Sequence, residues 1–233
     1  MLPKNCQDCP VWKKSLFRDF NPDLVDWLAN RKSWHSFSKK DIIFRQGQDV
    51  GGIFCHLSGL AKVVQTDEAE KVRFSRLVFP GDTSGHRSLF IETQYKGTAS
   101  VVSNDLQVCF IDKEDILFLL SNDVSFSKNL VAKISTELNR SEEDKISIKE
   151  QTVRTRLAHL IYNLCNEYSD KINETQFVIK TEITKRDIAG LLMVANETVI
   201  RLMSEMRIEG VISYKDKKIL VNDLDKIKKL SRL

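Results

Sequence analysis

The 233-residue sequence has no apolar run long enough to cross a membrane, and its N-terminus, MLPKNCQDCPVWKK, lacks the apolar core of a signal peptide. We therefore expect a cytoplasmic protein with no membrane partner. The five cysteines are an odd number in a long chain, which argues against a disulfide framework. No Ser/His/Asp set and no paired nucleophile and base stand out, so we do not expect an enzyme. The length leaves room for two compact domains.

Positive charge is in excess only in the C-terminal part of the chain. Residues 1–150 hold 21 Lys and Arg against 21 Asp and Glu, whereas residues 151–233 hold 15 against 11. The whole net charge of +4 therefore lies after residue 150. Because a positive excess favours contact with phosphate groups, nucleic acid is the expected partner of this part.

Glycine is concentrated in the first part of the chain, where seven of the nine glycines lie within residues 1–97. They separate short runs rich in β-branched and aromatic residues, which is typical of antiparallel strands in a sandwich or barrel. The expected strands are 41–44, 53–57, 60–64, 72–79, 99–102 and 107–111. Helices are expected on both sides of this region, over 10–32 and 112–121.

Neither glycine nor proline occurs from Val124 to Gln151, which predicts one long helix. An imperfect heptad pattern runs through it and just beyond, at Val131, Ile134, Leu138, Lys145, Ile148 and Thr152. We interpret the helix as a connector whose apolar positions pair with the same helix of a second subunit. The alternative is a helix that packs only on its own domain.

The last part of the chain has the pattern of a winged helix–turn–helix. An amphipathic helix over 153–168 and a short strand over 177–179 precede the segment 183–214, ITKRDIAGLLMVANETVIRLMSEMRIEGVISY. Thr184 and Asp187 predict a capping box, a turn is expected near 193–195, and Asn196 is expected to cap a second helix. That helix should end at Gly210, before a hairpin formed by 211–214 and 219–221.

The second helix of this motif would enter the major groove of DNA. Asn196, Glu197, Ile200 and Arg201 are expected to face outward near its N-terminal end, where such helices contact base edges. Arg can bind guanine through two hydrogen bonds, and Glu can accept one from cytosine. The alternative for Glu197 and Arg201 is a solvated ion pair across one helical turn. Lysines 215, 217 and 218 at the hairpin tip are candidate phosphate contacts.

Three segments carry a resemblance to a known family. KKDIIFRQGQDVGGIFCHLSGLAKVV (39–64) resembles the opening of a cyclic-nucleotide-binding jelly roll, and PGDTSGHRSLF (80–90) resembles its phosphate cassette. With the helix–turn–helix segment, the chain resembles the cyclic-AMP receptor and fumarate–nitrate-reduction (CRP/FNR) family of bacterial transcription regulators. The resemblance implies an α+β protein: a β-barrel or jelly-roll sensor domain over 1–122, a dimerisation helix and hinge over 123–150, and a winged helix–turn–helix over 151–233.

The resemblance also implies partners and DNA contacts. The protein would bind double-stranded DNA as a homodimer on a palindromic site with a TGA-like core, and would contact RNA polymerase. Asn196 stands where the cyclic-AMP receptor has Arg, so recognition of one base pair should differ. The implied DNA-binding residues are Thr184, Lys185, Arg186, Asn196, Glu197, Thr198 and Arg201.

The family's effector pocket is incomplete in this sequence. Its Arg–Ser pair, which binds the phosphate, falls on Gly97 and Thr98, and Ser84 or a neighbour replaces its ribose-binding Glu. Lys96 or Arg87 would have to supply the positive charge that a buried phosphodiester needs. We therefore do not expect cyclic AMP as the effector, although a cyclic nucleotide in a divergent pocket remains an alternative. The pocket candidates are Gly81, Ser84, Gly85, Arg87, Gly97 and Thr98.

The cysteines suggest another input. Cys6, Cys9 and Cys109 resemble three of the four cysteines that hold an oxygen-sensing iron–sulfur cluster in the FNR branch, but the remaining one falls on Ser15. A cubane cluster has four iron corners to satisfy. An isolated CxxC suits zinc or a redox dithiol equally well, and a vestigial motif is a further alternative. Cys55 or His35 would be needed to complete a site, and the sequence places neither near Cys6.

Overall fold

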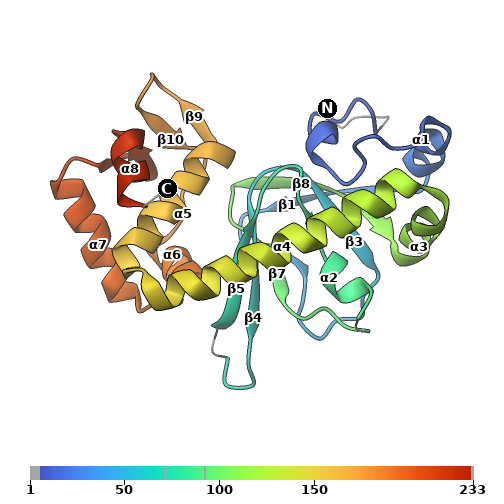
Figure 1. The fold of residues 1–233 in the computed structure, drawn as a ribbon, viewed down its shortest axis with the longest axis horizontal. Coiled ribbons are helices and arrows are strands. Elements are labelled where there is room, and N and C mark those ends of the chain that lie inside the picture. Colours follow the sequence, from blue (N-terminus) through green and yellow to red (C-terminus); the bar gives the residue numbers. More distant parts are fainter. Residues whose placement is uncertain (1–5, 71, 92, 232–233) are drawn as a thin grey trace. The chain divides into compact units, whose positions relative to one another are not determined.

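The computed structural model describes residues 6–70, 72–91 and 93–231, without the side chains of 73–75 and 144 (Figure 1). The chain divides into two compact units. The N-terminal unit comprises residues 1–65 and 76–141, and the C-terminal unit comprises residues 66–75 and 142–233. Within the described ranges, no helix is both long enough and apolar enough to cross a membrane.

The strands that precede residue 113 form two four-stranded sheets. One has the order β1-β8-β3-β6 and the other the order β2-β7-β4-β5. Of the two expected arrangements, the described strands form the jelly-roll-like sandwich and not a closed barrel. The strands are β1 Ser33–Ser38, β2 Ile42–Phe44, β3 Gly52–Ser58, β4 Ala61–Thr66, β5 Val72–Val78, β6 Thr83–Ser84, β7 Thr98–Val101 and β8 Asp105–Asp112. All six predicted strands are confirmed, while β1 and β6 were not predicted.

The expected helix over 10–32 is wrong in its extent. It is a 3-10 turn, η1 (Trp12–Lys14), and a short helix, α1 (Pro22–Ala29). Asn21 caps α1 by accepting a hydrogen bond from the Asp23 backbone, and Pro22 follows at the first helical position, so both residues start a new helix. The other helices before residue 124 are α2 (His86–Leu89) and α3 (Lys113–Asn122).

The long helix α4 (Val124–Glu150) reaches from the N-terminal unit into the C-terminal unit. Its beginning is held by Asp123, whose carboxylate accepts hydrogen bonds from the backbone of Phe126 and Asn21. Phe126 and Leu130 are buried in the core of the N-terminal unit. Thr152 does not extend the heptad pattern of α4, because its hydroxyl instead caps the next helix.

The C-terminal unit contains the predicted winged helix–turn–helix. Its helices are α5 (Val153–Glu167), α6 (Lys185–Leu192), α7 (Asn196–Ile208) and α8 (Leu224–Leu230). Its strands are β9 (Ser169–Lys171), β10 (Phe177–Ile179), β11 (Ile212–Lys215) and β12 (Lys218–Val221), in the sheet order β11-β12-β10-β9. The hairpin of β11 and β12 is the wing.

Two details of the helix–turn–helix bear on its function. The capping box of Thr184 and Asp187 at the start of α6 is confirmed, and Met193 ends α6 in the left-handed conformation with φ of 54°. Asn196 is not the cap of α7, however. Ala195 occupies that position without a side-chain hydrogen bond, and Asn196 is the first helical residue.

Candidate functional site

One face of α7 is apolar and the opposite face is open to solvent. Glu197, Ile200 and Arg201 are exposed on the outer face near the N-terminal end of the helix. Because the inner face is packed in the core, the rotation of the helix is set, and this determines which side chains point outward. The buried residues of the inner face are Val199, Leu202, Met203 and Met206.

Arg201 forms an ion pair, but not with the expected residue. Its guanidinium lies 2.6 Å from the Glu205 carboxylate, one turn further along α7, and its side chain is 64% exposed. No pair between Glu197 and Arg201 is present among the residues that the structure describes. An exposed pair of this spacing stabilises a helix by only about 0.3–0.5 kcal/mol, so Arg201 can leave Glu205 at little cost.

The other predicted DNA contacts lie at the starts of α6 and α7. Lys185 and Arg186 are exposed in the first turn of α6, and the ammonium group of Lys185 lies 5.8 Å from the centre of the Tyr214 ring. Thr198 is half-buried in the first turn of α7. The Asn196 side-chain oxygen is buried and has no hydrogen-bond partner within the described residues.

The predicted effector residues of the N-terminal unit contact other parts of the same unit. Ser84 is buried, with its hydroxyl 2.9 Å from His56 Nε2, and the Thr98 hydroxyl accepts a hydrogen bond from the Gln46 backbone. Arg87 donates to the Glu137 carboxylate at 2.6 Å. The three glycines have backbone roles: Gly81 and Gly85 adopt positive φ, and a side chain at Gly97 would approach the Val64 carbonyl.

Glu137 of α4 is the centre of a partly buried ionic network. Its carboxylate accepts from Arg87, lies 3.0 Å from His86 Nε2 and lies 3.5 Å from the Lys133 ammonium group. Burial opposes ionisation of Glu137, but the hydrogen bond from His86 and the nearby arginines outweigh it and hold its pKa well below the usual range. Burial lowers the pKa of His86, and the hydrogen bond to the Glu137 carboxylate opposes this effect.

His56 is a second buried imidazole, only 1% exposed. Burial, with a smaller contribution from the positive charge of Arg76, lowers its pKa to about 3. Its Nδ1 has no hydrogen-bond partner among the described residues. The neutral ring packs behind the region that the sequence predicted as a phosphate cassette.

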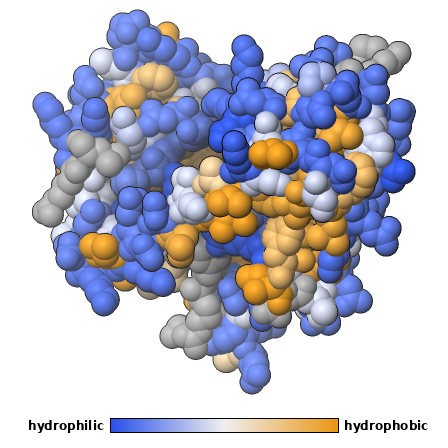
Figure 2. Space-filling view, turned by 45° about the vertical axis from the view of Figure 1, so that its right-hand side comes forward, coloured by the Kyte–Doolittle hydropathy of each residue, from blue (hydrophilic) through white to orange (hydrophobic). Residues whose placement is uncertain are grey.

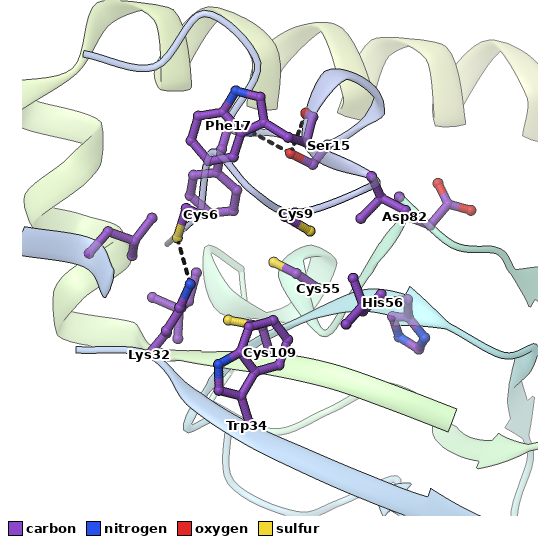
Figure 3. Close-up of a pocket in the computed structure, with 16 residues that line it drawn as sticks. Cys6, Cys9, Ser15, Phe17, Lys32, Trp34, Cys55, His56, Asp82 and Cys109 are labelled. Atoms are coloured by element: carbon purple, nitrogen blue, oxygen red, sulfur yellow. Dashed lines mark hydrogen bonds between the residues drawn. The ribbon is translucent and has the colours of Figure 1, made fainter. Parts of the chain in front are cut away.

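A pocket in the same unit brings four cysteines together (Figure 3). Cys6 and Cys9 belong to the N-terminal segment, whereas Cys55 of β3 and Cys109 of β8 lie directly opposite each other on adjacent strands. Figure 3 shows the sulfurs of Cys9, Cys55 and Cys109 directed into the same space, with Cys6 at its edge. The structure thus places Cys55 beside the three predicted cysteines, whereas His35 does not line this pocket.

The surroundings of the thiols are mostly apolar. Burial raises the pKa of Cys9 and of Cys55, and it raises the pKa of Cys109 to about 12. Among the described residues that line the pocket, Lys32 supplies the one ammonium group, and its Nζ donates a hydrogen bond to Cys6 Sγ at 2.9 Å. In the described parts of the chain, no three Cys, His, Asp or Glu side chains converge tightly enough to hold a metal ion.

Sequence reasoning missed the role of β3 in this pocket. Both strands that carry Cys55 and Cys109 were predicted, but which residues of the two strands face each other was not. The register pairs Cys55 with Cys109, and β1, which was not predicted at all, pairs Trp34 with Cys109 on the other side. Predicting the pairing register of these strands would have identified Cys55 as a neighbour of Cys109.

A jelly-roll-like domain, a long helix and a winged helix–turn–helix on one chain define a DNA-binding transcription regulator. Residues 34–123 match the cyclic nucleotide-binding domain family, and residues 155–230 match the Crp-like helix-turn-helix domain family. The chain belongs to the CRP/FNR family of transcription regulators, as the resemblance in its sequence predicted.

Individual relatives agree with this assignment. The chain is 26% identical over 232 residues to the anaerobic regulatory protein of Pasteurella multocida, covering 97% of this chain and 82% of that protein. It is 22% identical over 231 residues to the fumarate and nitrate reduction regulatory protein of Escherichia coli K12, covering 97% and 90%. FixK2 from Bradyrhizobium japonicum has a similar fold, with a TM-score of 0.73 at 17% identity over 85% of this chain and 96% of that one.

Proposed function

We propose that this regulator binds a palindromic DNA site as a homodimer, with one α7 helix in the major groove of each half-site. The observation that carries the proposal is the outer face of α7, where Glu197 and Arg201 are exposed while the opposite face is buried. Arg201 reads a guanine and Glu197 the cytosine paired with it, within a TGA-like half-site. Asn196, at the first position of α7, contributes the base contact that should differ from that of the cyclic-AMP receptor.

The remaining contacts of this proposal are with the DNA backbone. Thr184, Lys185 and Arg186 surround the N-terminus of α6, and Thr198 lies in the first turn of α7. Two positive charges and exposed helix N-termini suit phosphate oxygens. Exposed lysines at the tip of the wing would extend this contact along the backbone.

Dimerisation through α4 is supported by the side of the helix that faces away from the core. Val131, Ile134 and Leu138 are 63%, 41% and 58% exposed, whereas Phe126 and Leu130, on the adjacent side of the helix, are buried. Figure 2 shows apolar residues gathered on the N-terminal unit. The spacing of the three exposed residues matches a heptad seam, which a second copy of α4 would cover.

The DNA proposal is tested by fluorescence anisotropy on a TGA-containing palindrome and on a shuffled duplex at equal salt concentration. Arg201→Ala should lower specific affinity by about 1–3 kcal/mol, mostly for sites with the G·C pair intact. Arg207→Ala is the matched control, because Arg207 is exposed in the last turn of the same helix. An equal loss on both duplexes would contradict base reading by Arg201.

The input of the regulator lies in the N-terminal unit. The name of one relative, anaerobic regulatory protein, favours a response to oxygen or redox state through Cys6, Cys9 and Cys109. A cyclic nucleotide is disfavoured, because Arg87 already neutralises Glu137. We further propose that the protein acts in the cytoplasm, contacts RNA polymerase and catalyses no reaction of its own. Cyclic AMP should leave its DNA affinity unchanged.

A further inference from the structure

The cysteine pocket differs from the family's pattern at position 15. The family resemblance implies a ligand there, together with Cys6, Cys9 and Cys109. Ser15 is 8% exposed, and its hydroxyl donates to the Trp12 carbonyl at 2.8 Å and accepts from the Phe17 backbone at 3.1 Å. Residue 15 thus has a hydroxyl in place of a thiol, and both hydrogen bonds already use it within the turn, so the family's four-cysteine ligand set does not fit this chain.

Cys55 provides a fourth thiol in the pocket that Ser15 also lines. It lines the same pocket as the other three cysteines and lies opposite Cys109 on the neighbouring strand (Figure 3). We propose that Cys6, Cys9, Cys55 and Cys109 together form a four-thiolate site for an iron–sulfur cluster, with Cys55 in place of residue 15. The proposal deepens the sensory part of the proposed function and rests on it.

The arrangement of the thiols favours a cluster over a single ion. A four-coordinate zinc ion binds sulfur at about 2.3 Å, so its ligands must converge on one point. A cluster binds each thiolate through a different iron atom, so its cysteines line a space instead. Four thiols distributed around one pocket match the second arrangement.

Charge and shielding suit the same group. Four thiolates give a cluster a net negative charge, which a nearby ammonium group stabilises. Lys32 is placed for this role, since its Nζ lies 2.9 Å from Cys6 Sγ and 5.0 Å from the centre of the Trp34 ring. Apolar side chains of Phe17, Leu28 and Ile111 form other parts of the wall and limit access of water.

The four cysteines come from two parts of the unit, the N-terminal segment and the sheet. Cys55 and Cys109 are held in register by the β3–β8 ladder. Cys6 and Cys9 lie in a turn closed by the Cys9 backbone, which donates to the Cys6 carbonyl at 3.1 Å. A cluster would therefore link the N-terminal segment to the sheet.

The test is anaerobic reconstitution of the full chain with Fe²⁺ and sulfide, followed by absorbance and by assays of iron and acid-labile sulfide. Wild-type protein should bind both in equal amounts. Changes outside the ligand set already weaken metal sites by about 10–100-fold, so Cys55→Ala should lower bound iron at least about tenfold. Ser15→Ala and Cys165→Ala, the latter at a buried cysteine of the C-terminal unit, should bind iron like the wild type.

A second measurement covers the case in which Cys55→Ala fails to fold. Alkylation of wild-type protein, mapped by mass spectrometry, should show Cys6, Cys9, Cys55 and Cys109 protected after loading and reactive after chelation. The proposal is wrong if Cys55 stays equally reactive, if Cys55→Ala retains its iron, or if the wild type takes up zinc alone. Fluorescence anisotropy on the palindrome in the same samples separates the two proposals. If the reconstituted protein takes up no iron but still binds the palindrome selectively, the cluster proposal is wrong and the DNA-binding proposal stands.

Discussion

The two units use their charged side chains in opposite ways. In the N-terminal unit, Arg87, Lys133 and His86 meet at the partly buried carboxylate of Glu137. In the C-terminal unit, Arg186 and Glu197 are exposed on the helices proposed to meet DNA, and the inner faces of those helices are apolar. An anionic effector at Arg87 would have to displace Glu137, whereas DNA would meet side chains that are already open.

The comparison predicts that the largest loss of stability comes from Glu137. Glu137→Gln removes the charge that three basic side chains share. Breaking a buried ion pair costs about 3–5 kcal/mol, and the partial exposure of Arg87 places the expected loss near 3 kcal/mol. All three tryptophans, Trp12, Trp27 and Trp34, lie in the N-terminal unit, so their fluorescence during urea unfolding reports on this unit alone.

Lys128→Gln is the matched control for this change, because Lys128 is an exposed charged residue of the same helix and lies within the N-terminal unit. Its effect should stay within about 0.5 kcal/mol. If Glu137→Gln is equally harmless, the network contributes no net stability. The charged side chains of the two units would then differ in their location but not in their contribution to stability.

The second prediction concerns pH and sharpens the same contrast. His56 has a pKa of about 3 in the folded protein and an ordinary value of 6.5 when unfolded. The unfolded chain therefore binds a proton between these values while the folded chain does not, so stability is complete above pH 6.5 and falls as the pH drops toward 3. The loss is of the order of a few kcal/mol, since each pKa unit is worth about 1.4 kcal/mol.

Urea unfolding followed by tryptophan fluorescence at pH 7 and pH 5 measures this slope. His56→Gln should flatten it, because glutamine does not titrate. His35→Gln serves as the control, as His35 is exposed and lies in the same unit as the tryptophans. An unchanged slope in His56→Gln would mean that another group, such as His86, carries the pH dependence.

Local sequence patterns were sufficient to predict the helix–turn–helix, but they were insufficient to predict the contacts of the N-terminal unit. The capping box at Thr184 and the apolar period of α7 depend on neighbours within one or two turns, so both could be predicted. The position of Cys55 opposite Cys109 depends on strand register across more than fifty residues, and the Glu137 network joins α2 to α4. Such contacts between distant segments leave no periodic signal in a single sequence.

The smallest effect is predicted at Thr184, a residue that is both open to DNA and engaged in a contact within its own unit. Thr184 is exposed and is a proposed phosphate contact, yet its hydroxyl already accepts the Asp187 backbone N–H at 3.1 Å. Thr184→Ala should cost about 1 kcal/mol in stability, as loss of an N-cap does, and should weaken binding to both duplexes alike. Thr184→Ser keeps the hydroxyl and should restore both properties. If Thr184→Ala weakens DNA binding without changing stability, the hydroxyl serves the phosphate and not the helix.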